Sequence, residues 1–93
     1  MYATIRSYSG SGLADALATR ESDIRQVITT IDGFRAYYLV RTTDGNAVTI
    51  SVFDGQAGAE ESTRAAAAWV GENLADLAVS LPQVTTGEVA FSL

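Results

Sequence analysis

The stretch FRAYYLVRTTDGNAVTISVF, residues 34–53, decides the fold of this chain. Its two arms, residues 34–42 and 47–53, are rich in β-branched and aromatic residues, which predicts two strands. Asp44-Gly45 lies between them, and this dipeptide between two such runs is the strongest short-range signal for a β-hairpin. We therefore expect an antiparallel strand pair at the centre of the chain.

The residues before this hairpin predict a strand and then helical structure. Residues 2–8 alternate and carry β-branched and aromatic side chains, which favours a strand. Apolar residues then recur at helical spacing: Leu13, Leu17, Ile24, Ile28 and Ile31. Residues 18–23 interrupt this stripe, so either one long helix or two short ones are possible. Ser11 and Ser22 are candidate N-caps, and Gly33 suits the left-handed position past a helix end.

The residues after the hairpin predict a second helical region and a last strand. Residues 57–78 are rich in helix formers, and Trp69 borders their apolar stripe. That stripe consists of Ala66, Val70, Leu74, Leu77 and Leu81. Pro82 prevents continuation, and residues 84–93 predict a strand with Val89, Phe91 and Leu93 on one side. The order βαββαβ predicts a single α+β domain over residues 1–93, with a ferredoxin-like fold and a four-stranded antiparallel sheet.

The hairpin also predicts which side chains share a face of the sheet. A two-residue loop at Asp44-Gly45 pairs Leu39 with Ile50 and Tyr37 with Val52. One face, expected to meet the helices, then holds Ile5, Tyr37, Leu39, Val48, Ile50 and Val52. The other holds Tyr2, Thr4, Arg6, Tyr8, Phe34, Ala36, Tyr38, Val40, Ala47, Thr49, Ser51 and Phe53. A three-residue loop with a bulge would instead put Tyr37, Leu39, Ile50 and Val52 on the open face.

The second of these faces is too apolar to be an ordinary solvated sheet face. A second copy of the chain is the simplest partner, which predicts a homodimer with its two sheets packed together. The space between the sheets would then be lined by aromatic rings, hydroxyls and Arg6. The alternative is a tolerant surface on which aromatic residues serve only β-propensity.

Composition and charge exclude several classes of function. The 93 residues are 47% hydrophobic and 18% charged, with a net charge of −5, which argues against nucleic acid as a partner. Cysteine, histidine and lysine are absent, and all six basic residues are arginines. This removes thiol nucleophiles, imidazole bases, soft-metal sites and Schiff bases, so we expect no metal and no cofactor. Neither a membrane span nor a signal-peptide pattern is present, which predicts a cytoplasmic protein.

Six residues are candidates for a ligand site: Arg6, Tyr8, Tyr38, Ser51, Trp69 and Asn73. Arg6 suits an anionic or phenolate group, or it pairs structurally with a carboxylate such as Glu88 on a neighbouring strand or one across the dimer. The tyrosines offer hydroxyls but also suit packing. Ser51 has no visible base and would fill a polar cavity, while Trp69 suits a core or rim position. No residue is assigned a catalytic role.

Four segments carry a resemblance to the dimeric α+β barrel superfamily, which includes the antibiotic biosynthesis monooxygenase-like proteins. They are residues 2–8, 33–41, 43–45 and 61–74, and together they span nearly the whole chain. The resemblance implies a ferredoxin-like fold, homodimerisation through the sheets, and a cavity either between sheet and helices or inside the barrel. Haem-degrading members rely on an Asn, Trp and His trio, and chlorite-dismutase-like members also need a histidine. The missing histidine therefore excludes both branches.

These observations favour a small homodimeric α+β barrel protein that binds a small organic ligand, with aromatic molecules among the candidates, and they leave open whether it is an enzyme. The resemblance also permits a cofactor-independent monooxygenase of the antibiotic-biosynthesis type. A structural or regulatory subunit that pairs with another protein through its sheet is the third hypothesis.

Overall fold

A computed structural model of the chain describes residues 1–77 and 79–93. The elements follow the predicted order, except that the first helical region is two helices and a short 3₁₀ turn follows the last helix. They are β1 (Tyr2–Tyr8), α1 (Leu13–Ala18), α2 (Glu21–Thr29), β2 (Phe34–Arg41), β3 (Ala47–Phe53), α3 (Gln56–Asn73), η1 (Ala75–Leu77) and β4 (Gln83–Glu88).

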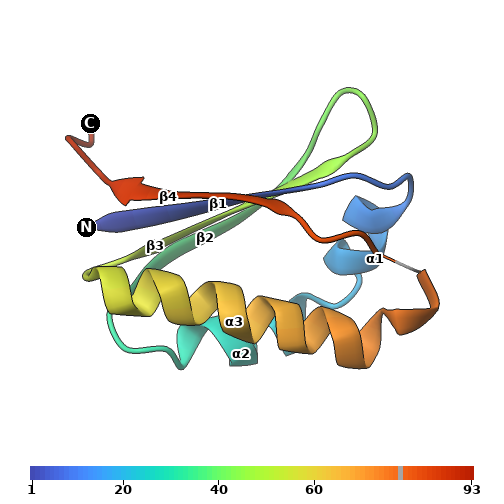
Figure 1. Cartoon of the computed structure of the whole chain (residues 1–93), viewed down its shortest axis with the longest axis horizontal. Coiled ribbons are helices and arrows are strands. Elements are labelled where there is room, and N and C mark those ends of the chain that lie inside the picture. The colour runs from blue at the N-terminus through green and yellow to red at the C-terminus, as the bar shows by residue number, and fades with distance from the viewer. Residues whose placement is uncertain (78) are drawn as a thin grey trace.

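The strands form one four-stranded antiparallel sheet in the order β2-β3-β1-β4. All three helices lie on the same side of this sheet, and the other side is left open (Figure 1). The predicted ferredoxin-like α+β fold is therefore confirmed. No helix in the described ranges is both long and apolar enough to cross a membrane.

The first helical region breaks at Thr19 and Arg20, which settles the alternative that the sequence left open. The Thr19 hydroxyl donates to the Ala16 carbonyl at 2.8 Å, and a side chain that binds backbone in this way competes with helix continuation. The predicted caps are wrong. Gly12, at φ 83°, precedes α1 and Arg20 precedes α2, with no side-chain cap hydrogen bond at either start.

The C-terminal part differs from the prediction in two ways. α3 ends at Asn73, earlier than expected, and Ala78, where the expected helix ends, lies outside the described residues. β4 ends at Glu88 because that residue already pairs with Tyr2, the first residue of β1. Residues 89–93 have no strand left to pair with, so the predicted strand to residue 93 is wrong.

The hairpin register differs from the two-residue loop of the sequence prediction. Leu39 pairs with Thr49 rather than Ile50, and Arg41 pairs with Ala47. Gly45 has a φ of 88° and the Thr42 amide donates to the Asn46 carbonyl at 3.0 Å, so three residues form the loop. A one-residue change of this kind moves every side chain of a strand to the other face relative to its neighbour.

The predicted faces are therefore wrong for β1 and β3. They are also wrong for Phe34 of β2, because a register shift between Phe34 and Ala36 puts its ring against Phe53 in the core. The face toward the helices carries Tyr2, Thr4, Arg6, Tyr8, Tyr37, Leu39, Ala47, Thr49, Ser51 and Phe53. Arg6 and the hydroxyls are buried there. They tolerate burial because α3 presents further hydroxyls to them, which supplies the hydrogen bonds that a buried polar group needs.

The open face of the sheet holds the aliphatic residues instead. Its members are Ala3, Ile5, Ser7, Ala36, Tyr38, Val40, Val48, Ile50, Val52, Gln83, Thr85 and Gly87. None of these twelve residues is charged, and Ile5, Tyr38 and Val40 are each more than a third exposed. The open face is apolar, as predicted, but it is made of different residues.

Two apolar clusters form the core under the helices. One gathers around Tyr8, Leu13, Leu17 and Leu74, and the other around Ile28, Phe53 and Ala59. Polar residues of β1 and β3 lie buried along the same face of the sheet. This polar stretch defines the candidate site.

Candidate functional site

Arg6 lies in the middle of β1 with only 1% of its surface exposed. Its guanidinium donates four hydrogen bonds, all to hydroxyl groups. Nε donates to Thr49 Oγ1 at 3.2 Å and Nη2 to Ser51 Oγ at 2.7 Å. Nη1 donates to Ser62 Oγ at 3.1 Å and to Thr63 Oγ1 at 3.3 Å. We call these five residues the Arg6 cluster.

Sheet register and helix placement create the Arg6 cluster. Thr49 is the direct cross-strand partner of Arg6, and Ser51 is two residues further along the same face. Ser62 and Thr63 come from α3, and Ser62 is itself held by a 2.6 Å hydrogen bond to the Ala59 carbonyl. Residues from two other elements, β3 and α3, therefore converge on the guanidinium of a β1 residue.

The Arg6 charge is not balanced by a carboxylate within the described residues. The other five arginines all form ion pairs with aspartate or glutamate at the surface. The pairing of Arg6 with Glu88 that the sequence suggested does not form. Arg6 donates its hydrogen bonds to the hydroxyls of the Arg6 cluster instead. A buried charge without a counter-ion is costly even when it is hydrogen-bonded, so the site retains an uncompensated positive field.

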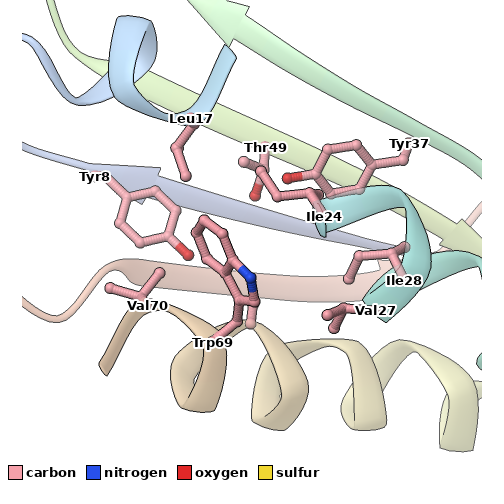
Figure 2. Close-up of a pocket in the computed structure, with 10 residues that line it drawn as sticks. Tyr8, Leu17, Ile24, Val27, Ile28, Tyr37, Thr49, Trp69 and Val70 are labelled. Atoms are coloured by element: carbon pink, nitrogen blue, oxygen red, sulfur yellow. The ribbon is translucent and has the colours of Figure 1, made fainter. Parts of the chain in front are cut away.

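A pocket lies between this part of the sheet and the helices (Figure 2). Its volume is about 20 Å³, which is room for about one water molecule. Its lining is largely apolar and contributed by all three helices and three strands: Tyr8, Leu17, Ile24, Val27, Ile28, Tyr37, Thr49, Ala66, Trp69 and Val70. Figure 2 shows the hydroxyls of Tyr8 and Tyr37 directed inward from opposite sides, with the Trp69 ring between them.

A larger groove of about 480 Å³ adjoins this pocket along α1, α2 and β2. It shares Leu17, Ile24, Ile28 and Tyr37 with the pocket. A volume of this size lies within the range of small-molecule sites. The groove and the pocket are therefore neighbours with four wall residues in common, Tyr37 among them; we call the small pocket the deep end and the groove the outer part.

Burial raises the pKa of the Tyr8 hydroxyl above its ordinary value of 10.0, and the nearby charge of Arg6 opposes this rise. Burial likewise raises the pKa of Tyr37, again opposed by the charge of Arg6. Both phenols are therefore neutral at physiological pH. Each has a proton to donate to a group in the pocket.

The structure brings three of the six sequence-predicted residues to the pocket or directly behind it. Tyr8 and Trp69 line the pocket. Arg6 lies behind Thr49, which separates it from the pocket surface. Ser51 is fully buried and serves Arg6 as an acceptor without lining the pocket.

The other two predicted residues lie elsewhere. Asn73 bonds the Trp69 carbonyl at 2.9 Å and accepts from Arg20 at 3.1 Å. The Arg20 guanidinium in turn lies 5.6 Å from the centre of the Trp69 ring, so Asn73 orients residues beside the pocket. Tyr38 lies on the open face and is 58% exposed. It therefore does not converge with Arg6 and Tyr8, because neighbouring strand residues point to opposite faces.

The sequence interpretation missed Tyr37 and the two α3 hydroxyls. Tyr37 had been placed on the face opposite to Arg6, a direct result of the two-residue loop. A three-residue loop with Thr49 opposite Leu39 would have found it. Ser62 and Thr63 carried no local signal, since only the docking of α3 on β1 brings them to the guanidinium.

No protein family matches the sequence, and no curated protein is similar enough in sequence to count as a match. Solved structures do match, over nearly the whole chain. A variant of MhuD, with two manganese protoporphyrin IX molecules per active site, has 14% identity and a TM-score of 0.77 and covers 100% of this chain and 98% of that one. ActVA-Orf6, a monooxygenase of Streptomyces coelicolor in complex with nanaomycin D, has 16% identity and a TM-score of 0.73 over 99% and 89%.

SnoaB, a cofactor-independent oxygenase from Streptomyces nogalater, also matches this chain in structure over nearly its whole length. A variant of it has 17% identity and a TM-score of 0.70, and the match covers 99% of this chain and 95% of that one. The fold of this chain is thus that of antibiotic biosynthesis monooxygenase-like proteins, as the sequence resemblance implied. At these identities the likeness establishes the fold alone.

Proposed function

We propose that this protein binds a small aromatic ligand in the groove and pocket between its sheet and helices. The observation that carries the proposal is the division of the site into a largely apolar groove and a deep end with inward-directed phenol hydroxyls. Such a combination of apolar walls and a few convergent polar groups is typical of small-molecule sites.

The pocket contains its own reporter, because Trp69 is the only tryptophan in the sequence and lines the deep end. A ligand that reaches the pocket should change Trp69 fluorescence. We expect 4-nitroanisole, a small aromatic molecule of nitrobenzene type, to quench it saturably. Quenching that rises only linearly with concentration, as in free solution, would contradict the proposal.

A pair of variants on α3 separates binding in the pocket from binding at the surface. Ala66 lines the pocket, whereas Ala67 is exposed on the same helix. Ala66→Leu should abolish saturable quenching because the added side chain fills the deep end. Ala67→Leu should leave it unchanged. Thermal melts of both variants check that the fold is retained.

We also propose that two copies pair through the open face. That face is apolar and carries no charge in a chain whose net charge is −5, so two copies meet there without like-charge repulsion. Light scattering should give twice the 9.8 kDa chain mass. Ile50→Asp, in the open face, should give the single mass, whereas Leu81→Asp, which changes an exposed residue outside it, should not.

A cofactor-independent monooxygenase is the second candidate, favoured by the shared fold of SnoaB and ActVA-Orf6. In such a reaction an anthrone methylene is oxidised to a ketone. One atom of O₂ becomes the ketone oxygen, and the other leaves as water with the two methylene hydrogens. The substrate provides all the electrons. Oxygen uptake with quinols and anthrone-like phenols tests this activity, and uptake no faster than in buffer would contradict it. The porphyrin of the MhuD structure is not carried over, since this chain lacks histidine as a haem ligand.

A further inference from the structure

We infer that the deep end of the pocket selects an ionised oxygen, so that the ligand is bound as a phenolate or enolate rather than as a neutral molecule. This inference rests on the proposed binding function and adds the chemical class of the ligand. It is carried by the Arg6 cluster, the two phenol hydroxyls and the size of the deep end.

The positive charge of Arg6 acts on the pocket from behind its wall. Arg6 is 99% buried and all four of its hydrogen bonds go to neutral hydroxyls, with no carboxylate partner among the described residues. Its field is therefore not cancelled locally, and a low-dielectric surrounding transmits it further than water does. Thr49, in the pocket wall, accepts from Arg6 Nε at 3.2 Å and so links the charge to the pocket.

The hydroxyls of Tyr8 and Tyr37 are the groups that would donate hydrogen bonds to the ionised oxygen of the ligand. Both side chains line the deep end, and the charge of Arg6 is close enough to oppose the rise in pKa of both hydroxyls. A hydrogen bond to a charged acceptor is about twice as strong as one to a neutral acceptor, so these hydroxyls favour an anionic oxygen. Arg6 thus acts from behind the wall through its charge, and the tyrosines make the contact.

The dimensions of the site agree with this arrangement. The deep end has room for about one water-sized group, and the adjoining groove of about 480 Å³ has room for an aromatic body. A ligand would therefore place a single oxygen between Tyr8 and Tyr37 and its rings in the groove. Tyr37, which borders both parts, would contact the oxygen and the ring beside it.

The test uses 4-nitrophenol, whose phenolate absorbs at longer wavelength than the phenol, with 4-nitroanisole as the probe that cannot ionise. We expect the apparent pKa of protein-bound 4-nitrophenol to fall by about one unit, equivalent to about tenfold tighter binding of the phenolate than of the phenol. 4-Nitroanisole should bind about as weakly as the neutral phenol, with no dependence on pH.

Variants distinguish this role from a purely structural one. Arg6→Gln should abolish the shift in the probe pKa while 4-nitroanisole still binds, and Arg6→Lys should restore part of the shift. Tyr8→Phe and Tyr37→Phe should each reduce the shift, and they keep the test available if the Arg6 variants do not fold. Tyr38→Phe, on the open face, is the matched control and should leave the shift unchanged.

The outcomes separate the two proposals. If 4-nitroanisole binds but bound 4-nitrophenol titrates at or above its free pKa, the preference for an anion is overturned and the binding function stands. If neither probe binds, the binding function fails and the inference fails with it. An undiminished shift in Arg6→Gln would show that the anion preference has another source.

Discussion

Gly58 lies in the first turn of α3, and for Gly58→Ala packing and helix propensity predict changes of opposite sign in the free energy of unfolding. Glycine costs up to about 1 kcal/mol relative to alanine in a helix, so propensity alone predicts that Gly58→Ala stabilises the fold. A Cβ at this position, however, would lie 2.8 Å from the Asp32 carbonyl oxygen and 3.0 Å from Phe53 Cδ1. The carbonyl is backbone and cannot move aside cheaply.

The magnitude follows from these contacts. Overpacking of a core costs about 1–3 kcal/mol, which exceeds the gain in propensity, so Gly58→Ala should lose about 1 kcal/mol of unfolding free energy. Gly71 lies near the other end of the same helix, and a Cβ there meets nothing within 4 Å. Gly71→Ala should therefore gain about 0.5–1 kcal/mol.

Urea and thermal unfolding of the two variants measure this difference. It amounts to about 1.5–2 kcal/mol, or about 6–16 °C in Tm for a domain of this size. All samples need the same protein concentration, because self-association would make Tm depend on it. If Gly58→Ala were as stabilising as Gly71→Ala, the close approach of α3 to Phe53 and Asp32 would be refuted.

Three further predictions concern pH and the packing of the core. Burial raises the folded-state pKa of Tyr8 and Tyr37, so the stability that their neutral forms provide is fully present below about pH 10 and is lost as pH rises through the raised pKa values. Urea unfolding midpoints measured between pH 8 and 11 should therefore fall at the alkaline end. Midpoints that do not change with pH would argue against the burial of these two phenols. Phe53→Ala, at a fully buried site, should cost about 3–5 kcal/mol in urea unfolding; a loss below about 1 kcal/mol would contradict its place in the core. Gly33→Ala should cost about 1–2 kcal/mol, because φ is 80° and the new Cβ would lie 3.2 Å from Asp54 Cβ; a thermal melt that matches the wild type would show that this turn relaxes.

Local patterns were sufficient to predict most elements of this protein. Alternation and helical spacing report which segments are strands or helices, since each pattern follows from the period of the backbone itself. The Asp44-Gly45 turn, the left-handed conformation of Gly33 and the βαββαβ order were all predicted in this way, although α2 already ends at Thr29 rather than at Gly33. The helix break at Thr19 remained open because it depends on a single hydroxyl–carbonyl contact.

The faces of the sheet were not predictable to the same degree. They depend on whether two or three residues form the loop around Gly45, and one residue reverses the relation between the two strands. The same error placed Tyr38 beside Arg6 and moved Tyr37 away from it. The C-terminal strand was overextended for a related reason, because its length is set by where β1 begins rather than by its own alternation.

The amino-acid order alone therefore determined the fold class, the succession of elements and the absence of thiol, imidazole and amine chemistry. Only the tertiary structure decided that Arg6 lies under the helices, surrounded by hydroxyls from β3 and α3, and that Tyr8 and Tyr37 line a pocket in front of it. The reason is physical. Periodicity is a property of a few neighbouring residues, whereas the partners of Arg6 lie 43 to 57 positions away and meet it only once register and helix docking are set.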